Sequence, residues 1–306
     1  MRAGESGVVE LPRPADIMTS GVLVVVAVLV LGGVRGQEEA PRTRMVVLDR
    51  GSKNVFRVDV GLNLSDHHVE TFNIPSLGSV ADMDYDFVDD RIYVLNNLEE
   101  FMSIFVNGTG RRMIPYQGDH PETLAIEPNE KVIFFGTFAQ GGRNKIQSMG
   151  IDGSGKTVLA QRARDPMRMA VDFQNRYLYW MESCGCPWMY RMRYDGSGIQ
   201  RLPHEINQKK SPHSIDFSTL TLYSDNRGGL KKMSLDTGES QMILYGQMGH
   251  FMTDTVYDPR TGRIFLTNDR YFDTVSAYTS NGTRLGQLDW IPLTRDQKKV
   301  VRINPL

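Results

Sequence analysis

The 306-residue chain has only two cysteines and no excess of charge of either sign. Its 35 basic and 36 acidic residues give a formal net charge of −1, so the composition shows no electrostatic footprint for nucleic acid or for an anionic membrane surface. Stretches with the 3.6-residue periodicity of amphipathic helices are also lacking. Partners of the chain are therefore not expected among nucleic acids.

Known catalytic motifs are lacking as well. The sequence contains no Gly-x-Ser-x-Gly elbow, no His-Glu-x-x-His pair and no phosphate-binding glycine loop. We therefore expect a protein that is not an enzyme.

What the chain does contain is a repeat, clearest in residues 169–197. A short apolar strand ends in Asp172, and after a turn an aromatic strand follows over residues 177–182. An alternating strand over residues 188–194 then leads to the Asp195-Gly196 hairpin turn. The unit reads as consecutive antiparallel strands.

Two landmarks of this unit recur with a period in the low forties. The first is an acid followed seven residues later by an aromatic residue, and the second is a glycine-containing hairpin turn. The acid and aromatic pairs are Asp86/Tyr93, Glu127/Phe134, Asp172/Tyr179, Asp216/Tyr223 and Asp258/Phe265. The turns are Asn107-Gly108, Asp152-Gly153, Asp195-Gly196, Asp236-Thr237-Gly238 and Asn281-Gly282.

This period, with four short strands in each copy, predicts an all-β fold, a six-bladed β-propeller over residues 45–306. Five complete copies occupy residues 76–120, 121–164, 165–207, 208–248 and 249–290. A further copy begins at Met45 without its first strand, and one strand over residues 298–303 is left over at the other end. Pairing these two segments would close the ring and remove open sheet edges.

The amino terminus is different in kind. Residues 21–31 form an apolar run too short to cross a bilayer comfortably, followed by Val34-Arg35-Gly36. We interpret residues 1–36 as a secretory signal peptide, with Met18 as an alternative start, and residues 37–44 as a lead-in. The alternative is an uncleaved signal anchor that tethers the protein to a membrane.

Three acceptor sequons also indicate a secreted glycoprotein, at Asn63, Asn107 and Asn281. All three fall at the tip of the hairpin between the third and fourth strands of their copies. In a propeller these tips lie on one side, so glycans there would leave the opposite face free. Asn-Gly also suits a type I′ turn for conformational reasons alone, which explains two of the three equally well.

The stretch Tyr179-Trp180-Met181-Glu182, between Asp172 and Asp195-Gly196-Ser197, resembles the class B, or YWTD, repeat of the low-density lipoprotein receptor family. The resemblance covers about residues 45–306, and none of the other copies carries the full tetrapeptide. It implies an extracellular propeller that binds a protein ligand. The cysteine-rich modules that accompany such propellers in that family cannot be present in a chain with two cysteines.

The five recurring acids have two interpretations. Each can accept hydrogen bonds from the backbone of its own turn, which we favour, or together they can form a carboxylate ring that binds Ca²⁺ along the propeller axis. The first interpretation requires no cofactor. The second would fit a Ca²⁺-dependent lactonase or esterase, our alternative function. The acids are Asp86, Glu127, Asp172, Asp216 and Asp258.

The two cysteines, Cys184 and Cys186, lie between the second and third strands of the central copy. In an oxidising compartment they are the only partners available to each other, so we expect a local disulfide. Because such a bridge is strained and reducible, a redox role is a weaker alternative. A zinc site lacks further ligands at fixed spacing.

Connections between the second and third strands collect aromatic and arginine side chains on one face, the loop face. Exposed rings and guanidinium groups on loops of a rigid scaffold are typical of protein-binding surfaces. We expect an extracellular protein ligand to bind there. The predicted contact residues are Arg143, Trp188, Arg227, Arg270, Tyr271 and Phe272, with Phe251 and Met252 nearby.

Three of the six histidines, His120, His213 and His250, fall in connections on the same face. Solvated loop residues are the expected state. The alternative is a switch that changes a partner contact between extracellular and endosomal pH, because histidine titrates in that range.

Overall fold

The computed structural model describes residues 40–49, 52–139, 144–161, 163–182, 188–205, 213–225, 229–245, 252–268, 275–291, 293 and 299–304. The chain divides into two compact units, Met1–Ala40 and Pro41–Leu306. Apart from Ala40, the first unit lies outside the described residues, and so does the predicted signal peptide.

The second unit contains six four-stranded antiparallel sheets, numbered here as blades 1 to 6. Blade 1 consists of β24 (Lys299–Asn304), β1 (Thr43–Asp49), β2 (Asn54–Val60) and β3 (His67–Asn73). Blade 2 consists of β4 (Val80–Asp86), β5 (Arg91–Asn96), β6 (Phe101–Phe105) and β7 (Arg112–Ile114). Blade 3 consists of β8 (His120–Glu127), β9 (Val132–Phe138), β10 (Lys145–Gly150) and β11 (Thr157–Gln161). Blade 4 consists of β12 (Pro166–Asp172), β13 (Tyr177–Glu182), β14 (Trp188–Arg193) and β15 (Gln200–Glu205). Blade 5 consists of β16 (His213–Asp216), β17 (Thr221–Asp225), β18 (Leu230–Ser234) and β19 (Ser240–Leu244). Blade 6 consists of β20 (Met252–Asp258), β21 (Arg263–Asn268), β22 (Val275–Thr279) and β23 (Arg284–Gln287).

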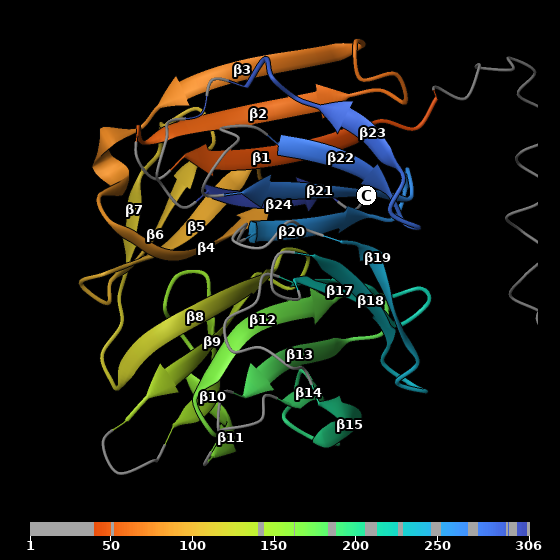
Figure 1. Ribbon diagram of the computed structural model, residues 1–306. Helices are drawn as coiled ribbons and strands as arrows, with labels where there is room; N and C mark the ends of the chain where they lie inside the picture. Colours follow the sequence, from red (N-terminus) through yellow and green to blue (C-terminus); the bar gives the residue numbers. More distant parts are fainter. Residues whose placement is uncertain are drawn as a thin grey trace, which may run out of the picture. The chain divides into compact units, whose positions relative to one another are not determined.

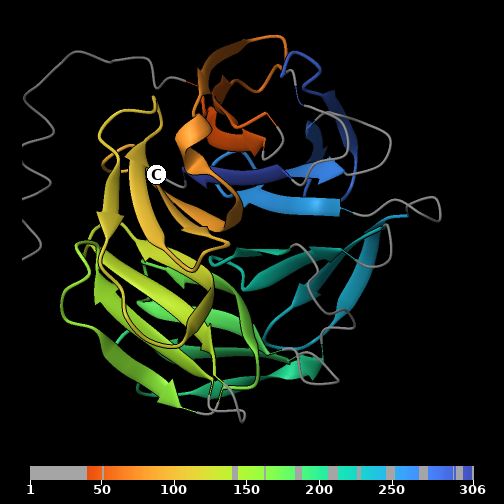
Figure 2. The same cartoon turned by 90° about the vertical axis from the view of Figure 1, so that its left-hand side faces the viewer.

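The blades follow one another around a common centre, as Figure 2 shows. The first strands of neighbouring blades contact each other in an unbroken series from β24 through β4, β8, β12, β16 and β20 back to β24. This series forms the inner wall of a six-bladed β-propeller. Helix is confined, among the described residues, to the 3-10 turn η2 (Pro75–Leu77).

Ring closure occurs where the sequence predicts it. β24 pairs antiparallel with β1, which is therefore the second strand of blade 1 (Figure 1). The register joins Arg44 to Asn304 and Asp49 to Lys299. β1 begins at Thr43, two residues before the predicted start of the propeller, because Thr43 and Arg44 already pair with β2.

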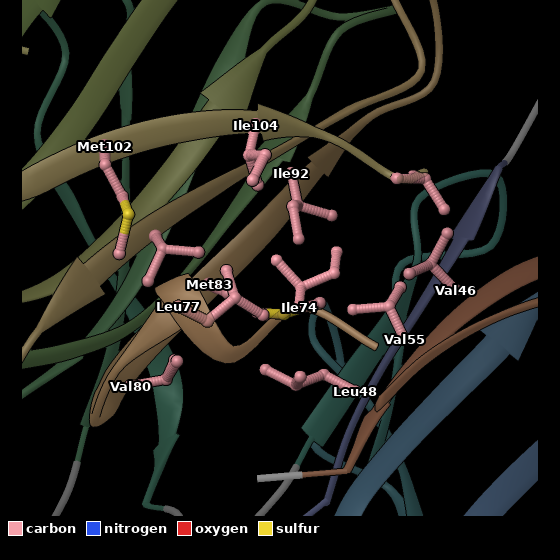
Figure 3. Packing of buried hydrophobic residues seen from close by; sticks show 12 residues of the cluster. Val46, Leu48, Val55, Ile74, Leu77, Val80, Met83, Ile92, Met102 and Ile104 are labelled. Atoms are coloured by element: carbon pink, nitrogen blue, oxygen red, sulfur yellow. The ribbon is translucent and has the colours of Figure 1, made fainter. Parts of the chain in front are cut away.

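The aromatic landmarks pack between blades. Six clusters of buried apolar residues are present among the described residues, one for each of the six interfaces between neighbouring blades. Tyr93, Phe134, Tyr179, Tyr223 and Phe265 each belong to the cluster shared with the following blade. Figure 3 shows the cluster between blades 1 and 2, where Val46, Leu48 and Val55 meet Ile74 and Met83. Because one four-stranded sheet cannot cover its own apolar faces, these contacts are what stabilises each blade.

The hairpin glycines also follow the prediction. Gly108, Gly153, Gly196, Gly238 and Gly282 all have positive φ, from 74° to 89°. At Gly196 a second constraint acts, because a Cβ atom there would lie 2.7 Å from the carbonyl oxygen of Leu159 in blade 3. Only glycine satisfies both the backbone conformation and the close approach of the neighbouring blade.

The alternation of strand direction gives the propeller two faces. Connections from first to second strand and from third to fourth strand lie on one face, here named the turn face. Connections from second to third strand, and from one blade to the next, lie on the opposite loop face.

Candidate functional site

Trp188 is the one predicted contact residue that the structure describes. It begins β14 on the loop face, it is half-buried, and the Arg201 guanidinium lies 4.2 Å from the centroid of its ring. Arg143, Arg227, Arg270, Tyr271 and Phe272 lie outside the described residues, as does Phe251. Met252, the last of the neighbouring residues, begins β20.

Sequence reasoning missed exposed apolar side chains on the loop face, among them a neighbouring pair. Leu98, in the β5–β6 turn, is 79% exposed, and Phe138, the last residue of β9, is 43% exposed. Exposing apolar side chains to water is unfavourable, and such side chains are typical anchors where they gather at a protein interface. They belong to neighbouring blades 2 and 3.

A polar contact joins the two blades between these apolar residues. Glu99, next to Leu98, places Oε1 2.5 Å from Nδ1 of His120, and His120 is the cross-strand partner of Phe138. Both side chains of the pair are exposed, 46% for Glu99 and 60% for His120. His120 therefore has a carboxylate partner on the loop face, while the pH switch proposed for it stays a prediction. His213 begins β16, and His250 lies outside the described residues.

The turn that presents Leu98 is held rigidly. The Asn96 side chain, 8% exposed, accepts hydrogen bonds from the backbone N–H groups of Leu98 and Glu100 at 2.9 Å each. Its amide donates to Oε2 of Glu100 at 2.8 Å, and the backbone N–H of Glu99 donates to the Asn96 carbonyl at 3.0 Å. An Asn side chain that closes a turn in this way fixes its conformation.

The connection from blade 2 to blade 3 is fixed by two further contacts. The Tyr116 hydroxyl donates to the Asp119 carbonyl at 2.5 Å, and Nζ of Lys145 lies 2.7 Å from Oδ2 of Asp119. The Tyr116 ring packs edge-on against Phe101 and Phe135. Burial, together with the Asp119 carboxylate, raises the pKa of Tyr116 to about 12. The loop face of blades 2 and 3 is thus a preformed surface.

The five recurring acids bind their own turns. Asp86 Oδ1 accepts from the backbone N–H groups of Val88 and Asp89 at 2.9 and 3.0 Å, and Asp172 Oδ1 accepts from Asn175 at 3.0 Å. Asp216, Asp258 and Glu127 accept in the same way from Ser218, Arg260 and Glu130. Burial raises the pKa of Glu127. These carboxylates act as turn caps, as the interpretation that we favoured predicts.

Their geometry does not fit the Ca²⁺ ring considered above. Among the described residues no group of three or more His, Cys, Asp or Glu side chains is placed to hold a metal ion. A hard cation such as Ca²⁺ needs six to eight converging oxygen ligands, whereas each of these acids faces the backbone of a different turn. We derive no chemistry from a metal at this position.

A cavity of about 260 Å³ lies between the inner strands of blades 2 to 6. Its lining combines charged and apolar side chains. The residues are Asp82, Asp84, Tyr85, Phe87, Leu124, Ile126, Pro128, Arg168, Met169, Ala170, Val171, Asp172, Phe173, Gln174, Ser214, Ile215, Asp216, Phe217, Ser218, Asp254, Thr255, Val256, Tyr257 and Pro259.

Two aspartates of β4 connect blade 2 to blade 3 along the cavity. Oδ2 of Asp82 accepts hydrogen bonds from Oγ1 of Thr123 at 2.8 Å and from the backbone N–H of Leu124 at 3.1 Å. Oδ2 of Asp84 accepts from the backbone N–H of Ile126 at 2.9 Å. Inner strands of neighbouring blades diverge, so these carboxylates satisfy amides that no strand reaches.

Among the described residues that line the cavity, Arg168 is the one basic side chain, and its backbone has positive φ within a strand. The register of β12 against β13 shifts between Met167 and Ala170, which places Arg168 in a β-bulge with φ of 50°. Left-handed backbone at a residue other than glycine costs about 1–3 kcal/mol and concentrates at functional sites. None of the described residues forms an ion pair or hydrogen bond with the Arg168 guanidinium.

Aromatic rings gather where the cavity reaches the turn face. Phe87, Phe173 and Phe217 each follow a turn-capping acid directly, and the rings of Phe87 and Phe173 lie 5.7 Å apart between their centroids. These two residues come from blades 2 and 4, so they meet above blade 3. All three rings are partly exposed. The cavity therefore has Arg168 and three aspartates on the side of the bulges, whereas at the turn face it has aromatic rings beside Asp172 and Asp216, whose carboxylates are bound to their own turns.

A signal for the cavity was present in the sequence. Asp82, Asp84 and Asp86 occupy alternate positions of one predicted strand, and Asp254 lies four residues before Asp258, on the same side of its strand. Carboxylates at alternate positions of a strand that should be buried on both faces need partners outside the apolar core. The repeat drew attention to the last acid of each strand, which caps a turn, rather than to those before it.

The sequon asparagines are exposed and close their own turns. Oδ1 of Asn107 accepts from the backbone N–H of Thr109 at 3.0 Å, and Oδ1 of Asn63 accepts from Ser65 at 3.1 Å. Asn281 makes the same contact to Thr283 at 3.3 Å. Asp152 and Asp195 do so in the hairpins that lack a sequon. The turn conformation alone thus explains Asn at these sites, and glycosylation stays a prediction.

Cys184 and Cys186 lie outside the described residues, so their predicted disulfide is not placed. Within the part of the chain that the structure covers, no helix has the length and apolar character needed to span a membrane.

These features define the protein as a six-bladed β-propeller with a rigid loop face and a charged inner cavity. A comparison with protein-family models and a search of curated proteins returned no match. Among solved structures, the fold is similar to one titled "Crystal structure of Nidogen/Laminin Complex", with a TM-score of 0.67, 14% identity, and coverage of 85% of this chain and 98% of the other. TolB from Acinetobacter baumannii is similar with a TM-score of 0.60, 10% identity, and coverage of 86% and 66%. At these identities the likeness concerns the fold.

Proposed function

We propose that the protein is a secreted, non-enzymatic propeller that binds an extracellular protein ligand through its loop face. The resemblance of residues 45–306 to YWTD repeats supports an extracellular setting, and so does the likeness to the propeller of a nidogen and laminin complex. Fold likeness by itself does not establish function, so the proposal depends on the site.

The observation that carries the proposal is the surface formed by Leu98, Glu99, His120 and Phe138. Two exposed apolar side chains, 79% and 43% accessible, flank an exposed hydrogen bond between Glu99 and His120 that joins two blades. Asn96 locks the turn that presents Leu98, so little conformational entropy is lost when a partner covers it. An apolar centre with a polar rim on a rigid support is the composition of a protein interface.

The rest of the proposed interface follows the loop face toward blades 4 to 6. Trp188, already stacked with Arg201, supplies an aromatic anchor there. Arg143, Arg227, Arg270, Tyr271 and Phe272 complete the proposed surface by their position in the sequence. Glycans on Asn63, Asn107 and Asn281 would occupy the turn-face hairpins and leave this surface uncovered.

Proteins captured from extracellular medium by the immobilised chain test the proposal. A Leu98→Asp/Phe138→Asp variant and a Trp188→Ala/Arg227→Ala/Arg270→Ala variant should each recover the specific partner at least tenfold less than the wild type, about 1.4 kcal/mol. The matched control is Ile199→Asp, which changes a 53% exposed apolar residue on a turn-face hairpin. Equal recovery by all four proteins would refute binding through the loop face.

A further inference from the structure

We propose that the inner cavity is a binding site for a small zwitterion with an apolar body, of the chemical class of a free hydrophobic α-amino acid. The proposal concerns a site distinct from the loop face and does not depend on the protein-binding function. It follows from the charges, the apolar surface and the size of the cavity.

The charged half of the cavity contains both signs. Arg168 supplies a cation, while Asp82, Asp84 and Asp254 supply anions. Two of these carboxylates, Asp82 and Asp84, each accept a hydrogen bond from a backbone N–H group of blade 3. A ligand with one charge would compensate one sign and be repelled by the other. A zwitterion compensates both, with its carboxylate facing Arg168 and its ammonium facing the aspartates.

Arg168 gives the strongest indication of a ligand. Its backbone is held in a left-handed bulge, and no described residue pairs with its guanidinium. Register shifts also occur near the start of β4, β8 and β20, but among the described residues other than glycine, positive φ inside a strand occurs only at Arg168. A planar guanidinium binds a carboxylate through two parallel hydrogen bonds, which offsets the cost of holding a partly buried cation.

The apolar half of the cavity sets the body of the ligand. Phe87, Phe173 and Phe217 surround the turn-face end, and Ile126 and Ile215 line the wall below them. An apolar side chain placed there is removed from water, which contributes about 25 cal/mol for each Å² of apolar surface buried. The two carboxylates at this end, Asp172 and Asp216, are buried and accept hydrogen bonds from their own turns with both oxygens, so the rings form the surface that a ligand would meet.

The size of the cavity limits the ligand to a metabolite. At about 260 Å³ it lies just below the usual range of about 300–1,000 Å³ for drug-sized ligands. The cavity is formed before any ligand binds, because hydrogen bonds of Asp82 and Asp84 fix β4 against β8. A preformed small site of this kind distinguishes ligands by the position of their charges.

Calorimetric titration of the purified full chain with four probes tests the proposal. L-Phenylalanine should bind with a saturable heat, as should L-leucine more weakly. 3-Phenylpropanoate lacks the ammonium group of L-phenylalanine, and 2-phenylethylamine lacks its carboxylate. Each analogue should bind with a Kd at least tenfold higher than that of L-phenylalanine. If neither amino acid binds, or if either single-charge analogue binds as tightly as L-phenylalanine, the proposal is wrong.

An Arg168→Gln variant assigns the carboxylate contact. It should raise the Kd for L-phenylalanine at least tenfold and leave 2-phenylethylamine unchanged, because that probe has no carboxylate. Arg112→Gln, at an exposed position of the outer strand β7, is the matched control and should bind like the wild type. If Arg168→Gln weakens both probes equally, Arg168 does not bind the ligand carboxylate. The probe series on the wild type decides the proposal even if this variant fails to fold.

Discussion

Replacing hairpin glycines tests how the blades hold one another. In the blade 4 hairpin, Gly196 and Gly198 both have positive φ, 85° and 65°. They differ in their surroundings, because a Cβ at Gly196 would lie 2.7 Å from the Leu159 carbonyl oxygen, whereas a Cβ at Gly198 meets no atom within 4 Å. The pair therefore separates the backbone cost of a side chain from the cost of pushing two blades apart.

The expected free energies follow from this difference. An L-residue in the left-handed region costs about 1–2 kcal/mol, which is the whole effect expected for Gly198→Ala. Gly196→Ala adds an overpacking cost of about 1–3 kcal/mol, because the obstructing atom is backbone and cannot rotate away. We expect Gly196→Ala to lower the free energy of unfolding by about 2–5 kcal/mol in total.

Urea unfolding followed by tryptophan fluorescence measures both values. Trp180, 1% exposed, lies in the cluster between blades 3 and 4, so it reports on the interface that Gly196 touches. Gly153→Ala and Gly155→Ala repeat the comparison in blade 3, where a Cβ at Gly153 would lie 2.5 Å from the Pro115 carbonyl oxygen and one at Gly155 meets nothing within 4 Å. Equal destabilisation within each pair would refute the role assigned to the hairpins.

Two further predictions concern a turn and the ring closure. Hydrogen bonds from the Ser154 side chain and backbone lower the pKa of Asp152. The contact therefore stabilises the folded state at pH values above the ordinary carboxyl pKa, and this stabilisation is lost as the pH falls through the lowered pKa. NMR titration should show that the Asp152 pKa rises toward its ordinary value in Ser154→Ala, and an unchanged pKa would contradict the assignment. Deleting residues 299–304 should leave β1 as an open edge and cause concentration-dependent association in light scattering, which a monomeric, cooperatively unfolding product would disprove.

The architecture was predictable because its landmarks are imposed by local chemistry and then repeated. A tight turn after each inner strand needs an acid such as Asp86, and each hairpin needs a glycine such as Gly196. The aromatic position, for example Tyr179, must fill the gap to the next blade. Each requirement recurs in every copy, so five weak signals reinforce one another. The pairing of β24 with β1 then followed from the one unmatched strand at each end.

The sites were less predictable because they depend on residues far apart in the chain. The contact of Glu99 with His120 joins two copies, and neither residue is a landmark of the repeat. Arg168 adopts positive φ without a glycine or asparagine to announce it. The aromatic cluster of Phe87 and Phe173 forms across an intervening blade. Such arrangements form only when the ring of blades closes. The sequence repeat predicts the strands of each blade, but it does not predict which side chains meet in the space between the blades.

The antiparallel pairing of β24 with β1 in blade 1 affects how the propeller responds to force. Arg44 faces Asn304, so the beginning of β1 and the end of β24 emerge from the same end of the sheet. Tension applied between the segments attached there would load the ladder one pair at a time, peeling it from Arg44 toward Asp49, instead of shearing all the pairs together. Under a pulling force the propeller should therefore open first at blade 1, at low load, while the other five sheets are still folded.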